Sequence, residues 1–149
     1  MSRILVLMRH AKSDWTGSEP DRLRPLAARG RRQAPEAGRW LAAHIPHLEL
    51  ALVSPATRTR QTWELAAAEL ADPPEVTYVD ELYAADLDEL VSVVDDIAVD
   101  RAVVVTHNPG IEELVEHLTG RAVEMKTSAL AVVDRDTGEL LAHGRPPGS

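Results

Sequence analysis

The sequence predicts an α/β fold, a three-layer α/β/α sandwich built around a mostly parallel central sheet. Two runs, residues 4–8 (ILVLM) and 101–106 (RAVVVT), are almost continuously apolar. Such runs are typical of strands buried on both faces of a parallel sheet, because helices then cover each face. Segments with helical periodicity alternate with the strands, which is the order expected of an α/β domain.

Length and composition bound the class of protein. At 149 residues the chain has the size of one domain, so we expect a single domain over residues 1–149. There is no cysteine, which excludes disulfides, cysteine metal ligands and a thiolate nucleophile. No stretch resembles a secretory leader or approaches the length of a membrane span. We therefore expect a cytoplasmic protein with no membrane partner.

The charges are unevenly distributed along the chain. The net charge is -8, yet the first sixty residues hold eleven of the sixteen Lys and Arg and five of the twenty-four acidic residues. A globally acidic chain is a poor non-specific binder of nucleic acid, so we expect no nucleic-acid partner. A local basic cluster can still attract a phosphate group. The arginines at 29, 31 and 32 are expected instead to form a solvated helix face.

The first strand is followed by a loop and a helix. The loop covers residues 14–26, and its length is typical of a binding loop or lid. Its charged residues either reach a ligand or, as we favour, fix the loop by ion pairs; they are Asp21, Arg22 and Arg24. The helix covers residues 26–44, and Pro35 should kink it or divide it in two.

Two later strands are each expected to lead directly into a helix. After the strand over residues 48–53, Ser54 suits an N-cap and Pro55 the first position of a helix that runs to about residue 70. After the strand over residues 101–106, Asn108 and Pro109 repeat that pattern. The other expected elements are a strand over residues 75–79, helices over residues 86–97 and 111–118, and an edge hairpin over residues 128–134 and 139–143 with a loose tail beyond it.

Three of these junctions carry charged or titratable side chains toward one edge of the sheet. Arg9 and His10 follow the first strand, Arg58 lies in the first turn of the helix after Ser54, and His107 follows the strand over residues 101–106. Open α/β sheets bind ligands at the carboxyl ends of their strands, so we expect these side chains to meet there. Taken singly, each also fits a structural role, as a strand end facing water, a surface arginine or a core histidine.

The combination of residue types favours phosphoryl transfer to a histidine nitrogen. Two arginines and helix N-termini suit a dianion, and two histidines supply a nucleophile and its partner. No glycine-rich phosphate loop, acidic magnesium cluster or set of three metal ligands is found, so we expect no metal and no cofactor. His10 would attack phosphorus while Arg9, Arg58 and a protonated His107 hold the phosphoryl oxygens. Water would then hydrolyse the phosphohistidine.

Three motifs, in order, resemble those of the histidine phosphatase superfamily, whose fold is phosphoglycerate mutase-like. Residues 7–15 (LMRHAKSDW) are similar to its Arg-His-Gly or Arg-His-Ala signature, and residues 54–62 (SPATRTRQT) look like its second motif. Residues 105–110 (VTHNPG) resemble the second-histidine motif of its short branch, the SixA-type phosphohistidine phosphatases. Arg24-Pro25-Leu26 and Arg29-Gly30 also match that branch, so the resemblance extends from about residue 3 to residue 130.

The resemblance implies roles for individual residues. His10 would be the phosphorylated nucleophile, and the phosphate pocket would consist of Arg9, Arg58 and His107. One feature departs from the family pattern, because phosphoglycerate mutases carry an acidic proton donor in a segment that is short here. Glu81, or its neighbour Asp80, is the candidate proton donor; the alternative, which we favour, is that this pair is a solvated strand end.

The expected activity is therefore removal of phosphate from phosphohistidine on proteins. Lack of a strong general acid disfavours alkoxide leaving groups and is less harmful for a phosphoramidate, whose nitrogen leaves more easily. The partner would be a phosphorylated protein or a small phosphate substrate. Alternatives are a phosphatase of small phosphoesters or phosphoanhydrides such as sugar or nucleotide phosphates, a phosphoprotein-binding module without turnover, and a metal-dependent hydrolase that uses both histidines and a carboxylate.

Overall fold

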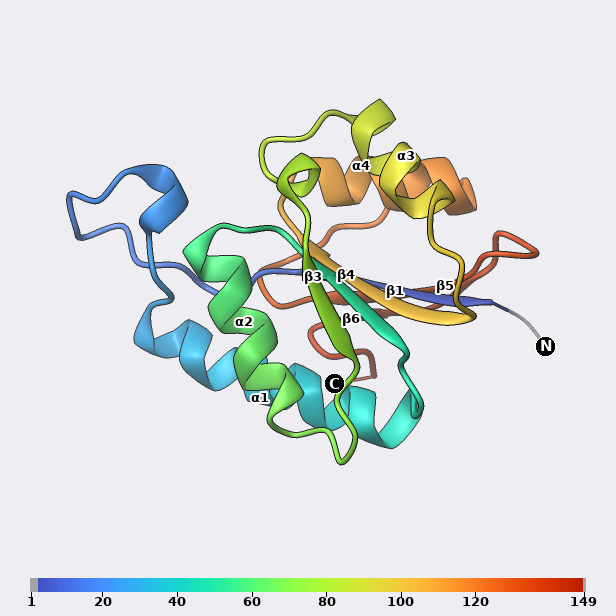
Figure 1. The fold of residues 1–149 in the computed structure, drawn as a ribbon, viewed down its shortest axis with the longest axis horizontal. Coiled ribbons are helices and arrows are strands. Elements are labelled where there is room, and N and C mark those ends of the chain that lie inside the picture. The colour runs from blue at the N-terminus through green and yellow to red at the C-terminus, as the bar shows by residue number, and fades with distance from the viewer. Residues whose placement is uncertain (1–2, 149) are drawn as a thin grey trace.

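The computed structural model describes residues 3–148, in which helices flank one six-stranded sheet of order β3-β2-β4-β1-β5-β6 (Figure 1). The strands are β1 (Ile4–Arg9), β2 (Leu50–Val53), β3 (Glu75–Tyr78), β4 (Arg101–Thr106), β5 (Leu130–Asp134) and β6 (Leu140–Gly144). The helices are α1 (Ala28–His44), α2 (Thr57–Ala67), α3 (Leu87–Asp95) and α4 (Gly110–Thr119), with short 3-10 turns η1 (Asp21–Leu23) and η2 (Asp80–Leu82).

The sheet is parallel over four strands and antiparallel at one edge. β4 pairs in parallel with both β1 and β2, and β2 pairs in parallel with β3. β5 runs antiparallel to β1, and β6 completes the predicted hairpin beside it. The prediction of an α/β fold with a mostly parallel sheet is confirmed.

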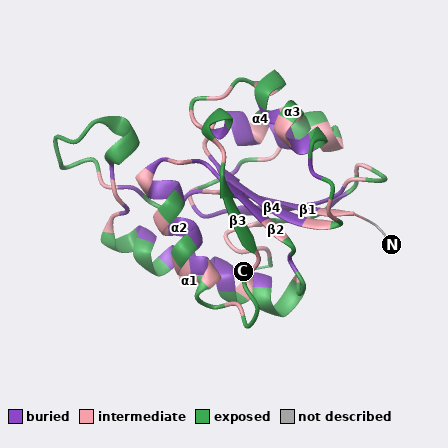
Figure 2. Ribbon diagram, viewed as in Figure 1, coloured by how far each residue is buried: buried purple, intermediate pink, exposed green. Residues whose placement is uncertain are grey.

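Strand β1 shows why its sequence contains no polar residue before Arg9. Leu5 and Leu7 pack with side chains of α3 and α4 on one face, whereas Val6 and Met8 pack with side chains of α1 and α2 on the other. Helices therefore cover both faces of the sheet, as Figure 1 shows, and β1 and β4 lie in the buried interior of Figure 2.

None of the helices in residues 3–148 has the length and apolar character that a membrane span requires.

Pro35 is predicted to kink its helix or to divide it; helix α1 continues past Pro35 as one helix, so the division is wrong. Proline removes one backbone hydrogen bond from the helix interior. The residues around it compensate, because Ala34, Ala37 and Leu41 are all fully or almost fully buried. Packing of a buried helix face supplies most of a helix's stability in a protein, and here it outweighs one missing bond.

Helix α2 begins later than predicted, and both predicted N-caps are wrong. The Ser54 hydroxyl oxygen lies 2.7 Å from Nε2 of His107 instead of capping α2. The Asn108 side chain donates through Nδ2 to a carboxylate oxygen of Glu112 at 2.9 Å, whereas an N-cap must accept a hydrogen bond. Each side chain therefore bonds to a residue distant in the sequence, Ser54 to His107 and Asn108 also to the carbonyl oxygen of Met125 at 3.1 Å, and not to the free N–H groups at the start of its helix.

The segment after β6 is held in place over its described residues, which corrects the predicted loose tail. Arg145 donates from Nε to the carbonyl oxygen of Thr127 at 2.7 Å, and Gly144 forms a β-bridge with Pro147. Ser149, which also belonged to the predicted tail, lies outside the described residues.

Helices α1 and α2 pack closely enough that one position on α1 has no room for a side chain. A Cβ atom at Gly38 would overlap backbone atoms of Ala66 on α2, including its carbonyl oxygen. Backbone atoms within a packed helix cannot move aside as a flexible side chain can. Glycine is therefore required at this crossing.

We expect Gly38→Ala to lower the free energy of unfolding by about 1–3 kcal/mol, measured by urea denaturation, because the methyl group overpacks the crossing. Alanine otherwise favours a helix interior over glycine by about 1 kcal/mol, so an increase in stability would contradict the close approach. Ala43→Leu, on the exposed side of α1, is the control and should change stability by less than about 0.5 kcal/mol.

Candidate active site

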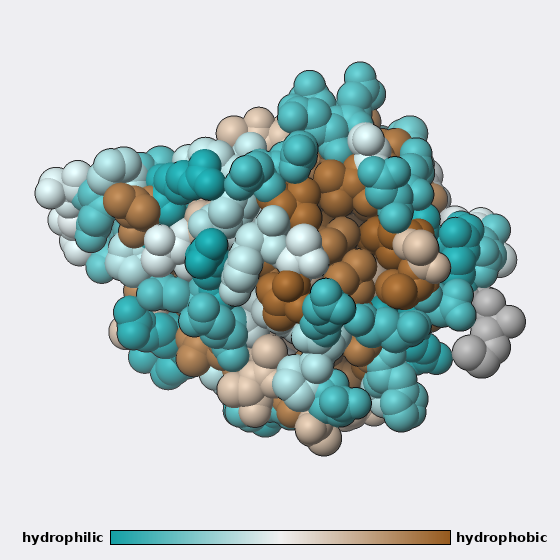
Figure 3. Space-filling view, in the orientation of Figure 1, coloured by the Kyte–Doolittle hydropathy of each residue, from teal (hydrophilic) through white to brown (hydrophobic). Residues whose placement is uncertain are grey.

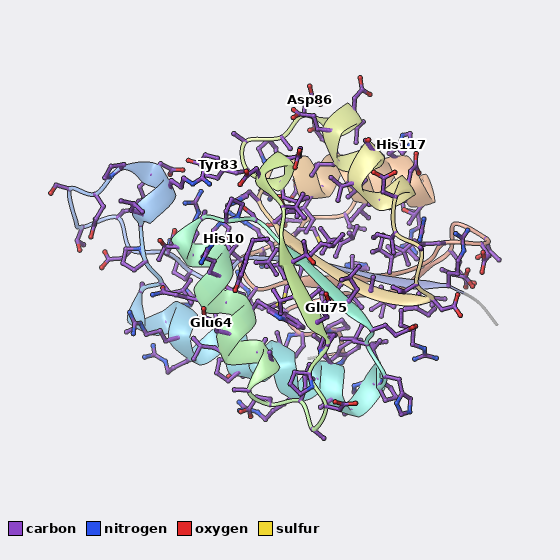
Figure 4. The ribbon with its side chains drawn as sticks, viewed as in Figure 1. His10, Glu64, Glu75, Tyr83, Asp86 and His117 are labelled. Carbon is purple, nitrogen blue, oxygen red and sulfur yellow. The ribbon has the colours of Figure 1, made fainter. Side chains whose placement is uncertain are left out.

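The four side chains predicted to meet do meet in the structure. Arg9, the last residue of β1, pairs in register with Thr106, the last residue of β4, so His10 and His107 follow adjacent strand ends. The imidazole centroids are 5.3 Å apart. Both histidines, Arg9 and Arg58 line one cavity of about 260 Å³. Figure 4 shows His10 at this end of the sheet, near the start of α2.

The backbone fixes the tautomer of His10. Its Nδ1 lies 2.8 Å from the carbonyl oxygen of Ala11, which can only accept a hydrogen bond. Nδ1 is therefore the protonated nitrogen, and Nε2 keeps its lone pair. Burial lowers the pKa of His10 to about 4, opposed by the Ala11 hydrogen bond and reinforced by the positive charges of Arg58 and Arg9. The ring is therefore neutral at pH 7, which a nitrogen nucleophile requires.

His107 is held by Ser54, the residue that the sequence predicts as an N-cap. Its Nε2 is bonded to the Ser54 hydroxyl, and the Tyr83 ring meets its imidazole edge-on at a centroid distance of 5.6 Å. Burial, together with the neighbouring charges of His10 and Arg58, lowers the pKa of His107 to about 3. The predicted protonated His107 is therefore not the form this environment favours, since desolvation penalises the cation.

Asp21 connects the loop over residues 14–26 to the helix that carries Arg58. Arg58 donates from Nη1 to the Asp21 carbonyl oxygen at 2.8 Å and from Nη2 to its carboxylate at 3.1 Å. The same carboxylate accepts from the Tyr83 hydroxyl at 2.7 Å and forms an ion pair with Arg24 at 3.1 Å. The Tyr83 hydrogen bond is the main reason that the pKa of Asp21 falls to about 2. The favoured prediction, that ion pairs fix this loop, is confirmed.

The cavity is strongly cationic. Four of its lining residues carry a positive charge: Arg9, Lys12, Arg24 and Arg58. Arg9 is oriented by donation from Nη1 to the carbonyl oxygen of Met125 at 3.0 Å. Around the cavity, in the part of the chain that the structure describes, Asp21 supplies the one carboxylate. Such a lining suits a dianion, and within residues 3–148 no three His, Asp or Glu side chains gather to hold a metal ion.

Glu81, the candidate proton donor, does not line this cavity. It lines a separate groove of about 550 Å³ between β2 and α3, whose floor includes Leu52 and Ile97. Figure 3 shows this groove as an apolar area on the face toward the viewer. The structure therefore does not bring Glu81 to His10, which agrees with the alternative of a solvated position.

Sequence reasoning missed the supporting residues of the site. The sequence pattern predicts an N-cap at Ser54 and no role in the site for Tyr83. Tyr83 follows η2, which lies beside the site because the Thr106 hydroxyl donates to the Leu82 carbonyl oxygen at 2.9 Å. The hydrophobic periodicity of the sequence does not predict such a contact, because it joins residues that are 24 positions apart.

This fold and cavity define an α/β protein with a cationic cavity at the carboxyl ends of its parallel strands. The chain belongs to the histidine phosphatase superfamily (branch 1), whose family model matches residues 5–90. It is 37% identical over 119 residues to an uncharacterised protein of Mycobacterium leprae, covering 76% of this chain and 71% of that protein. A further relative is a protein of Mycobacterium tuberculosis, and this chain spans about half (47%) of that protein's length.

Solved structures with the same fold include two SixA proteins. One, from Nakamurella multipartitia and provisionally assigned as a phosphohistidine phosphatase, has a TM-score of 0.85 at 28% identity, covering 100% of this chain and 98% of that chain. The other is the protein histidine phosphatase SixA complexed with tungstate, with a TM-score of 0.83 at 25% identity, covering 94% and 95% of the two chains. The predicted resemblance to the SixA branch is confirmed.

The low pKa of His10 predicts how stability depends on pH. Between pH 6.5 and about 4 the unfolded chain binds a proton at His10 that the folded chain excludes, so stability falls as the pH falls. From pH 7 to 5, the wild type should lose about 1–2 kcal/mol more unfolding free energy than His10→Gln, measured by urea denaturation. Asp21 does not interfere, because its contribution is lost only below about pH 3.8.

The matched control is His117→Gln, an exposed histidine in the last turn of α4 and far from His10 in Figure 4. It should lose as much stability as the wild type between pH 7 and 5. Equal losses in the wild type and His10→Gln would show that burial does not depress the pKa of His10.

Proposed function

We propose that this chain is a metal-independent phosphatase that works through a phosphohistidine on His10, and that its substrates are proteins phosphorylated on histidine. The observation that carries the proposal is the Nε2 lone pair of a neutral, buried His10 in a cavity lined by arginines. Family membership agrees with this chemistry. The domain proposed to perform it is the whole chain, residues 1–149.

In the first step, Nε2 of His10 attacks phosphorus in line with the leaving group. The new P–Nε2 bond forms as the bond from phosphorus to the leaving group breaks, and the leaving group keeps that electron pair and takes up a proton. Donation from Nδ1 to the Ala11 carbonyl oxygen stabilises the positive charge that develops on the ring. Phosphoryl transfer needs little beyond such positioning and charge neutralisation.

Arg9, Arg58 and His107 would hold the phosphoryl oxygens. The guanidinium groups are planar donors suited to phosphate, and Arg58 lies in the first turn of α2, where free N–H groups add positive potential. The negative charge of a bound phosphoryl group favours the protonated form of His107, opposing the desolvation that keeps it neutral. In the second step, water attacks phosphorus, the P–Nε2 bond breaks and phosphate is released.

The choice of phosphohistidine rests on the carboxylates of the site: among the described residues, Asp21 is the one carboxylate that lines the cavity. Asp21 remains ionised at neutral pH because its pKa is about 2, so it has no proton to donate. An alkoxide leaving from a phosphoester needs such a proton. The imidazole of phosphohistidine can instead be protonated by solvent at its distal nitrogen, since imidazole titrates near neutral pH, and then leaves as a neutral ring.

Trapping the intermediate tests this mechanism. Wild type mixed with radiolabelled phosphoimidazole should acquire an acid-labile, alkali-stable label on His10, and it should release phosphate from a protein chemically phosphorylated on histidine. His10→Ala should lose both, with phosphate release falling at least about a thousandfold, because the nucleophile is absent.

Two substitutions serve as controls for that experiment. His117→Gln removes an exposed histidine, and Glu81→Gln removes one of the carboxylates that line the separate groove, so neither should change turnover by more than about twofold. Turnover retained by His10→Ala would overturn the mechanism. Turnover lost in the presence of a chelator would favour a metal-dependent hydrolase, and faster turnover of sugar phosphates than of phosphohistidine would overturn the substrate class.

A further inference from the structure

Trp15 is exposed at the same cavity that contains His10. Its side chain is 69% exposed, the largest value among the exposed large apolar residues that the structure describes. The others do not line this cavity; they are Leu23, Val76, Tyr78 and Leu141. Leaving an indole in water forfeits one of the largest hydrophobic gains available to a side chain, so its position beside a phosphate pocket calls for a reason.

The indole is held in place although it is exposed. The Arg24 guanidinium carbon lies 3.5 Å from the Trp15 ring centroid, a cation–π contact. Arg24 is itself 7% exposed and donates from Nη1 to the Ser13 hydroxyl at 2.6 Å, while its other nitrogens bond to Asp21. Asp21 in turn binds Arg58. Trp15 is therefore linked, through a chain of fixed contacts, to the arginine that would bind phosphate.

We infer that Trp15 is the binding surface for a planar ring on the leaving group, and that this cavity has a second subsite for the imidazole of phosphohistidine or a ring of similar size. The inference rests on the proposed function and extends it from the phosphoryl group to the group that departs. Aromatic rings pair with one another through their faces and edges, and Trp offers the largest such surface. An exposed indole held beside the phosphate pocket is placed to make that contact.

The size of the cavity supports a small ring in preference to a large metabolite. Its volume of about 260 Å³ lies just below the range of about 300–1,000 Å³ that is usual for small-molecule sites. Phosphate would be held by Arg9, Arg58 and the two histidines, and Trp15, which lines the same cavity, would then contact the leaving group. Solvent protonates the distal nitrogen of the ring, and when the P–N bond breaks the other ring nitrogen keeps the electron pair, so that the ring departs as neutral imidazole.

A comparison of two phosphoramidates tests the subsite. Phosphoimidazole and phosphoramidate both break a P–N bond and would form the same phosphohistidine on His10, but only the first releases a ring. The ratio of their kcat/KM values should fall about five- to tenfold in Trp15→Ala, as expected for one lost aromatic pair. Trp15→Phe should keep most of the ratio, because it retains an aromatic face.

The control is Leu23→Ala, which removes another exposed apolar side chain from the same loop without touching the cavity, and which should leave the ratio unchanged. If Trp15 served only to fix Arg24, Trp15→Ala would slow both substrates equally and the ratio would stay constant. That result, or a ratio that Trp15→Phe fails to retain, would overturn the inference.

A binding measurement separates this inference from the proposed function. Phenylphosphonate carries a planar ring on an unreactive P–C bond, and methylphosphonate lacks the ring. By calorimetry, the preference for phenylphosphonate should fall about five- to tenfold in Trp15→Ala. If the wild type turned over neither phosphoramidate, but the preference for phenylphosphonate fell in Trp15→Ala, the proposed function would fail and the subsite would stand. If the wild type turned over the phosphoramidates, but the preference was unchanged in Trp15→Ala, the subsite would fail and the proposed function would stand.

Discussion

The site depends on the parallel pairing of β4 with its two neighbours, β1 and β2. Arg9 lies opposite Thr106, and the ladder continues one residue further, where the His10 amide donates to the Thr106 carbonyl oxygen at 3.2 Å. On the other side, the Ser54 amide donates to the Val105 carbonyl oxygen at 3.0 Å. The backbone therefore places His10 and Ser54 on either side of β4. A slip of one residue would turn these side chains to the opposite face.

The second constraint is electrostatic, and Asp21 supplies it. The four positively charged side chains that line the cavity repel one another. The Asp21 carboxylate binds both Arg24 and Arg58 and offsets part of that repulsion. The cost is that Asp21 stays ionised and is unable to act as an acid. The same contact that assembles the loop therefore narrows the chemistry toward leaving groups that need no protein-supplied proton.

The fold and the four central side chains were predictable because they depend on local patterns. Uninterrupted apolar runs identified β1 and β4, and residues directly after such strands lie at one edge of the sheet. Features that depend on contacts between distant residues were not predictable. Ser54 and Asn108 carry the side chains of N-caps but bond elsewhere, α1 continues past Pro35, and burial keeps His107 neutral.

The most direct test of the central claim is a crystal structure of this protein with vanadate, which mimics a phosphoryl group in transfer. We expect vanadium bonded to Nε2 of His10, with its oxygens in contact with Arg9, Arg58 and His107 at once. Because those residues come from three separate junctions, one bound ion that touches them all would establish that they form a single site. Vanadate bound away from His10, or held by the arginines with His10 out of reach, would contradict the account.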